Sequence, residues 1–126
     1  MKPQDMSRLI LSFLVCISCA LPWRMAAAHA VVVSAQPAAR SVMPAGEVAV
    51  DLEFNSRIDA TRSRLAVVDG KNVSTTLAIA EDAPANRIQS RTPTLTPGQY
   101  LLEWYVLSTD GHITRGRLKF EVAATE

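Results

Sequence analysis

The segment QYLLEWYVLSTDGHITRGRLKFEVA, residues 99–123, contains two strand patterns separated by an Asp-Gly-His sequence. Residues 117–123 alternate between large apolar and charged side chains, which predicts a strand with one buried face. Residues 99–108 carry large side chains on both faces, which predicts a central strand covered on both sides. The face expected to pack in the core holds Tyr100, Leu102, Trp104 and Val106, and the opposite face holds Leu101, Glu103, Tyr105 and Leu107.

The same alternation recurs upstream in EVAVDLEFN, residues 47–55, and predicts another half-buried strand. Four shorter strands are expected at residues 30–34, 63–69, 73–79 and 86–90. Segments rich in Gly, Pro, Asn and Asp separate them, and no stretch after the first third shows a capped helical pattern. Seven short strands predict an all-β fold, a single Greek-key antiparallel β-sandwich of the immunoglobulin-like or cupredoxin-like kind.

The first 28 residues have the composition of a cleaved signal peptide. Lys2 and Arg8 supply positive charge, residues 9–23 are largely apolar, and Ala26–Ala28 provide the small residues of a cleavage site. A retained membrane anchor is disfavoured because the uninterrupted apolar run falls short of the about 20 residues that a spanning helix needs. We therefore expect cleavage after Ala28.

Cleavage would leave residues 29–126 as one exported domain. Both cysteines, Cys16 and Cys19, would leave with the peptide, so the domain would contain neither a disulfide nor a thiol. A lipoprotein is the alternative, although neither cysteine is followed by a convincing mature start. Three of the 13 basic and one of the 12 acidic residues lie in the peptide, which leaves ten and eleven. A net charge near −1 predicts binding neither to nucleic acid nor to an anionic membrane.

The mature domain would hold two histidines, one at its first residue and one in the Asp-Gly-His sequence. The free α-amine and the Nδ1 atom of His29 could bind one metal ion together. His112 would add a third nitrogen and Asp110 an oxygen, and Gly111 between them permits a tight turn. Loops at one end of a sandwich cluster, so these groups could meet. Nitrogen and oxygen donors of this kind favour Cu(II).

A plainer interpretation of the same residues remains open. Asp-Gly-His is an ordinary turn sequence, in which Asp110 would accept a hydrogen bond from its own backbone two residues on and His112 would cap the loop. A mature chain can also begin with histidine by chance.

Three segments of the chain resemble the CopC family of periplasmic copper-binding (copper resistance) proteins: HAVVVSAQPAARS (29–41), VAVDLEFNS (48–56) and LTPGQYLLEWYVLSTDGHITRGRLKFEV (95–122). The resemblance implies a small Greek-key sandwich. It also implies that His29, Asp110 and His112 are the ligands of one Cu(II) per chain. The sequence departs from the family at Ile113, where many members have proline.

As a function, the resemblance implies a periplasmic Cu(II) carrier or buffer in copper homeostasis or resistance, with an inner-membrane CopD-type protein as a partner and no enzymatic activity. Some members bind Cu(I) through a methionine-rich segment, whereas here Met43 is the one methionine after residue 28 and is expected to pack in the protein. Two other classes stay open: a small copper oxygenase with a histidine brace, and a metal-free sandwich for adhesion or assembly. The alternating Arg115, Arg117 and Lys119 are expected to form a solvated strand face, with contact to an acidic partner as the alternative.

Overall fold

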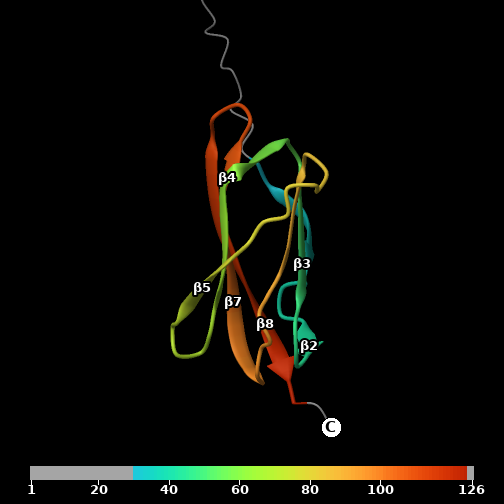
Figure 1. The fold of residues 1–126 in the computed structure, drawn as a ribbon, viewed down its shortest axis with the longest axis vertical. Helices are drawn as coiled ribbons and strands as arrows, with labels where there is room; N and C mark the ends of the chain where they lie inside the picture. Colours follow the sequence, from blue (N-terminus) through green and yellow to red (C-terminus); the bar gives the residue numbers. More distant parts are fainter. Residues whose placement is uncertain (1–29, 125–126) are drawn as a thin grey trace, which may run out of the picture.

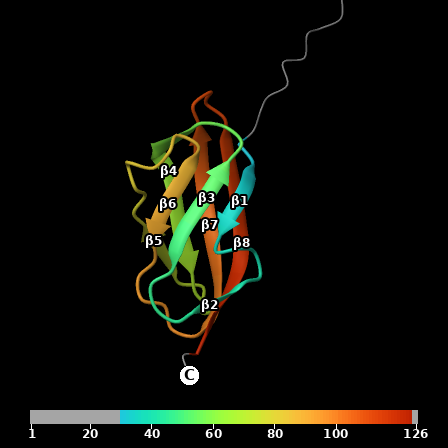
Figure 2. The same ribbon diagram turned by 90° about the vertical axis from the view of Figure 1, so that its right-hand side faces the viewer.

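The computed structural model describes residues 30–124, and these residues form two β-sheets packed face to face (Figures 1 and 2). The smaller sheet has the strand order β1-β3-β6 and the larger has the order β2-β8-β7-β4-β5. The strands are β1 (Val32–Gln36), β2 (Val42–Pro44), β3 (Ala49–Phe54), β4 (Ile58–Val68), β5 (Ser74–Leu77), β6 (Arg87–Arg91), β7 (Gly98–Ser108) and β8 (Ile113–Ala123). The all-β sandwich predicted from the sequence is confirmed.

Strand β7 lies at the centre of the larger sheet, as expected, between β8 and β4. Its antiparallel ladder with β8 runs without a shift from Gly98 opposite Val122 to Leu107 opposite Ile113. The sheets are not purely antiparallel, because β2 pairs in parallel with the last residues of β8. That pairing adds an edge to the larger sheet far from the turn between β7 and β8.

The core lies between the inward faces of the two sheets, and the predicted alternation identifies it correctly. Leu52 and Phe54 of β3 are fully buried, as are Leu102 and Val106 of β7. The rings of Tyr100 and Phe120 stack with their centroids 5.7 Å apart. Burial of a side chain of this size stabilises the fold by roughly 1.5–3 kcal/mol. Trp104 is half-buried and packs against this cluster, as the sequence predicted.

Several strand bounds differ from the sequence prediction; β8, for instance, begins at Ile113 and not at residue 117. The short β2 was not predicted, since it lies in a proline-containing segment and is defined by its pairing with β8 alone. Strand β4 begins at Ile58, five residues earlier than predicted, because its register shifts between Asp59 and Arg64 and breaks the alternation. Ser63 is buried within this irregular stretch, where its Oγ donates to the Asp59 carbonyl at 2.7 Å.

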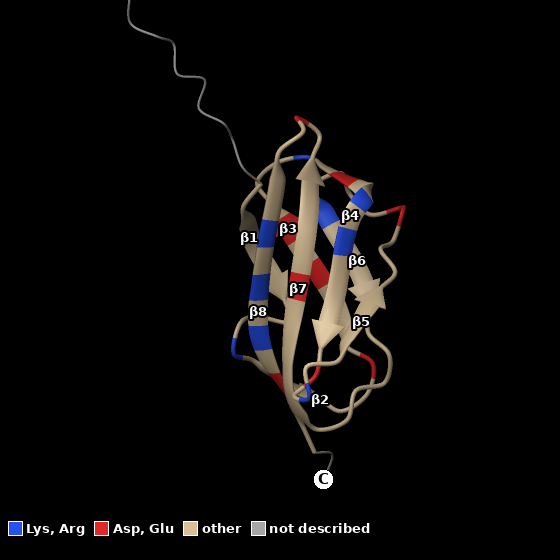
Figure 3. Ribbon diagram, turned by 90° about the vertical axis from the view of Figure 1, so that its left-hand side faces the viewer, with Lys and Arg blue, Asp and Glu red and all other residues tan. Residues whose placement is uncertain are grey.

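The prediction that β7 is covered on both sides is wrong. Leu101, Glu103, Tyr105 and Leu107 are half-buried, and Figure 3 shows their side of the sheet open in the described part of the chain. The apolar atoms on this side are shielded instead by neighbouring long side chains. Arg115 of β8, for example, lies over the Tyr105 ring with its guanidinium carbon 5.1 Å from the ring centroid.

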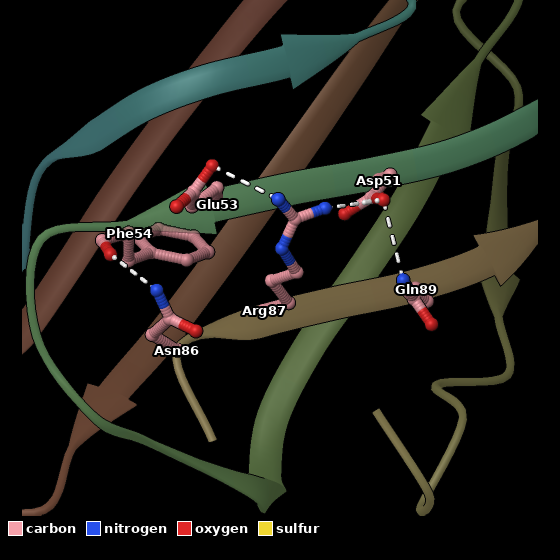
Figure 4. Close-up of polar contacts among 6 residues, drawn as sticks. All are labelled: Asp51, Glu53, Phe54, Asn86, Arg87 and Gln89. Atoms are coloured by element: carbon pink, nitrogen blue, oxygen red, sulfur yellow. Dashed lines mark hydrogen bonds and ion pairs between the residues drawn. The ribbon is translucent and has the colours of Figure 1, made fainter. Parts of the chain in front are cut away.

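The outer face of the smaller sheet carries a network of paired charges (Figure 4). Arg87 of β6 donates to Asp51 at 2.9 Å and to Glu53 at 3.1 Å, both on β3. Gln89 donates to the same Asp51 oxygen at 3.2 Å. These side chains are partly exposed, so the network pairs Arg87 within the protein but contributes little net stability.

Gly116 offers a sharp test of the packing between β8 and β7. A Cβ atom added there would lie 2.2 Å from Cζ2 of Trp104, the residue directly opposite in the ladder. Because a rigid ring cannot yield locally, we expect Gly116→Ala to lower the free energy of unfolding by roughly 1–3 kcal/mol. Urea denaturation measures this change.

Gly70→Ala is the matched control, since the nearest atom to its added Cβ would be 3.8 Å away. It should leave stability nearly unchanged, and Trp104→Leu should recover part of the loss in the Gly116→Ala background. Equal stability of Gly116→Ala and the unchanged protein would show that the ring is not held over Gly116.

Candidate metal centre

The turn between β7 and β8 brings Asp110 and His112 into contact. The Nδ1 atom of His112 lies 3.1 Å from Oδ2 of Asp110. The two side chains are 42% and 48% exposed, so a ligand from solution can reach both. The predicted convergence of these two residues at one end of the sheet is therefore observed.

The turn has the backbone that its sequence predicts. Gly111 has a φ of 92°, a left-handed value that residues with a side chain rarely adopt. Its amide donates to the Ser108 carbonyl at 2.9 Å, and the Ser108 amide donates to the His112 carbonyl at 2.9 Å. These two hydrogen bonds fix the path of the chain between the paired residues.

Asp110 also makes the backbone contact considered in the plainer interpretation of this turn. The His112 amide donates to Oδ1 of Asp110 at 3.2 Å. The other oxygen, Oδ2, is the one beside the His112 ring. A turn-stabilising carboxylate and a carboxylate facing the imidazole are therefore compatible, because each role uses a different oxygen.

Ser108, the last residue of β7, supports the Asp110–His112 arrangement. It was not recognised from the sequence as a site residue. It is almost completely buried, and its Oγ donates to Oδ1 of Asp110. The same Oγ lies 3.0 Å from the His112 carbonyl. One hydroxyl has a single proton to donate, so the carboxylate and the carbonyl compete for it. A serine two residues before the aspartate, on the inward face of the strand, is the signal that could have identified it.

The hydrogen bond from Ser108 is the main reason why the pKa of Asp110 falls from its ordinary 3.8 to about 2. The amide of His112 lowers it further, whereas desolvation opposes the shift. Both donors stabilise the charged form. The carboxylate is thus ionised throughout the neutral and mildly acidic range and loses its charge only as the pH falls through about 2.

His29, the first predicted ligand, lies outside the described residues. Within residues 30–124, no three His, Cys, Asp or Glu side chains gather in a way that could hold a metal ion. Of the three predicted ligands, the described residues contain Asp110 and His112, and metal binding by all three stays a prediction.

The residues that follow His29 are positioned beside the turn by a shared loop. Ala30 is fully buried, and the Val31 amide donates to the Asn55 side chain at 2.8 Å. The Thr109 amide in turn donates to the Arg57 carbonyl at 3.1 Å. The beginning of the described chain and the β7–β8 turn thus contact the same loop at one end of the sandwich (Figure 2).

Met43 lies away from this end. It belongs to β2, pairs with Val122 near the end of β8, and packs half-buried against the core. The interpretation of Met43 as a packing residue agrees with this position. Within residues 30–124 there is also no helix with the length and hydropathy needed to cross a membrane.

Comparison with known proteins places these features in a family. The model of the CopC domain matches residues 32–123, a range that includes Asp110 and His112. Protein YobA of Escherichia coli K12 is 31% identical over 98 residues, which cover 75% of this chain and 79% of that protein.

Two solved structures share the fold. CopC from Methylosinus trichosporium OB3b superposes with a TM-score of 0.69 at 27% identity, over 78% of this chain and 97% of that one. PcoC, described as a methionine-rich copper resistance protein from Escherichia coli, gives a TM-score of 0.64 at 24% identity, over 76% and 100% of the two chains. The second likeness concerns the fold alone. The family match and the YobA identity together establish that this chain belongs to the CopC family.

Proposed function

We propose that this protein is a periplasmic Cu(II) carrier or buffer that takes part in copper homeostasis or resistance. One Cu(II) would be held by the amine and imidazole of His29, by His112 and by Asp110. The observation that carries the proposal is the Asp110–His112 pair, a carboxylate kept ionised beside an imidazole at an accessible turn. Membership in the CopC family supports it.

The donor set explains the choice of metal and oxidation state. Imidazole, amine and carboxylate are hard or borderline ligands that suit Cu(II), which also stands highest in the divalent affinity order. Cu(I) prefers sulfur. Both cysteines lie in the predicted signal peptide, and Met43 is packed against the core at the other end of β8.

The exposure of the pair favours a carrier over an enzyme. Side chains that are 42% and 48% exposed leave a bound ion open to an exchange partner, for which we propose an inner-membrane CopD-type protein. A carboxylate ligand would occupy a coordination position that an oxygenase keeps for dioxygen. We therefore propose that the protein holds copper without catalysing a reaction.

Replacing the histidine of the turn tests the site directly. The His112→Ala variant should bind Cu(II) roughly a hundredfold more weakly, because loss of a ligand costs at least as much as loss of a supporting residue. Electron paramagnetic resonance of the copper-loaded protein should also show one nitrogen coupling fewer. Asp110→Asn should weaken binding less, since three nitrogens remain.

Thr109→Ala is the matched control for these variants. Its side chain is exposed in the same turn, and the hydrogen bond that Thr109 makes to Arg57 uses the backbone amide. Equal copper affinity for His112→Ala and the control would exclude His112 as a ligand.

The proposed chelate requires that the mature protein begin with His29. Intact-mass spectrometry of the exported protein should give this start. One extra glycine before His29 should abolish tight Cu(II) binding while the fold survives, because it moves the amine out of the six-membered chelate ring. The measurement is a competition titration against a Cu(II) chelator. Unchanged affinity would show that the α-amine is not a ligand.

Ser108 should act as a positioning residue for Asp110. In Ser108→Ala the pKa of Asp110 should rise from about 2 toward 3.8, since its strongest donor is lost. The stability that this depressed pKa provides at neutral pH, which the protein loses as the pH falls toward about 2, would then be smaller. Cu(II) affinity should fall by no more than it does in Asp110→Asn, because Ser108 acts on the metal only through that carboxylate.

NMR titration of the Asp110 carboxyl carbon measures that shift independently of copper. The control is Ser41→Ala, which removes a hydroxyl that donates to the Ala38 carbonyl in a loop remote in sequence. It should change neither the pKa of Asp110 nor the Cu(II) affinity. An unshifted Asp110 pKa in Ser108→Ala would contradict the positioning role.

A further inference from the structure

Basic residues gather on β4 and β8 of the larger sheet (Figure 3). Arg64 projects from β4, and Arg115, Arg117 and Lys119 project from β8; all four side chains are exposed. We call these four residues the basic face. None of them forms an ion pair with any other residue in the range 30–124, although Glu103 of β7 stands directly opposite Arg117.

The cations are arranged around an aromatic ring. Arg64, Tyr105 and Arg115 stand opposite one another on three adjacent strands. Arg115 lies over the Tyr105 ring, which orients its guanidinium. Two hollows of about 580 Å³ each share this row of three residues in their walls. One extends toward Glu103 and Arg117, and the other toward Leu107 and Ile113.

On the other outer face of the sandwich, the arginines are paired with carboxylates of the protein itself. There Arg87 binds two carboxylates, and Arg91 lies 3.8 Å from Glu47. Even Arg62, next to the basic face, pairs with Asp59 at 3.6 Å. The residues of the basic face differ in that the protein itself supplies no such carboxylate to them among its described residues.

We propose that the basic face is a docking surface for an acidic segment of a protein partner. Carboxylates of the segment would bind Arg64, Arg115 and Arg117, because guanidinium groups match carboxylates in shape and charge. Apolar side chains of the segment would enter the two hollows beside Tyr105. An extended chain fits this surface, since every second side chain points toward the sheet, so the acidic and apolar residues of the segment would occupy alternate positions on that one face.

The charge balance favours a protein segment over a membrane or a nucleic acid. Those two ligands present extended anionic surfaces that respond to the charge of the whole molecule, and the exported domain is expected to be close to neutral. A short acidic segment contacts the basic face alone. Glu103, in the middle of the sheet, would repel a uniform phosphate surface but can accept a hydrogen bond from a partner backbone.

The surface includes neither Asp110 nor His112, so docking can be tested on copper-free protein. The probes are a short peptide in which every second residue is alternately glutamate and valine with serine between them, the same peptide with glutamine for glutamate, phosphatidylglycerol vesicles and a DNA duplex. Amide chemical-shift changes in the exported protein locate binding, and calorimetry measures affinity. The glutamate peptide should shift the amides of β4, β7 and β8 around Tyr105 and bind more tightly than the other probes.

Arg64→Gln with Arg115→Gln should weaken binding of the glutamate peptide by roughly tenfold, since one exposed ion pair contributes less than a factor of ten. The control, Lys71→Gln with Arg91→Gln, changes the net charge equally at sites outside the basic face and should bind normally. All four side chains are exposed, so both variants should fold. Equal weakening in the two variants, equal binding of the glutamine peptide, or tighter binding of vesicles or DNA would overturn the proposal.

Discussion

The antiparallel ladder between β7 and β8 is the constraint on which both the core and the candidate site depend. Side chains alternate along a strand, so a slip of one residue would turn the buried Leu102 and Phe120 outward. The same register ends with Leu107 opposite Ile113, which leaves residues 108–112 to make the turn. Asp110 and His112 meet there because the core has fixed where the two strands stop.

Much of this could be predicted from the sequence, since burial of one face of a strand leaves a local pattern. The inward faces of β3, β7 and β8 follow from alternation, and the left-handed turn follows from Gly111. The Asp110–His112 contact follows from their spacing of two residues. His29 was inferred from an expected cleavage, and its position lies outside what the structure describes.

The features that could not be predicted arise from contacts between distant segments. The edge strand β2 is defined by β8, which lies some eighty residues away in the chain. The first half of β4 contains a register shift that removes the alternation, and its buried Ser63 accepts a hydrogen bond from Leu107 on β7. In the sequence Ser108 does not differ from other serines at strand ends. Its role depends on the turn, which places the Asp110 carboxylate within reach of its hydroxyl.

The open side of β7 was mispredicted for a reason that bears on function. The sequence pattern predicts that Leu101, Tyr105 and Leu107 are core residues. In the structure, long side chains beside them cover them in part, so the surface is both apolar and cationic. Nothing in the alternation of a single strand reveals which neighbours will stand opposite it in the sheet. That information resides in the register, which places Arg64 and Arg115 on either side of Tyr105.

The basic face and the candidate metal centre adjoin each other on β8, yet their electrostatics are separate. The pKa of Asp110 is depressed by Ser108 and by the backbone and ring of His112, and the arginines of the basic face are not among its causes. Water and salt screen exposed charges over a distance of about 8–10 Å. A partner that neutralised Arg64 and Arg115 would therefore change the protonation of the Asp110 carboxylate little. If both proposals hold, docking would bring a copper acceptor alongside the turn without itself releasing the ion, and transfer would depend on the acceptor's own ligands.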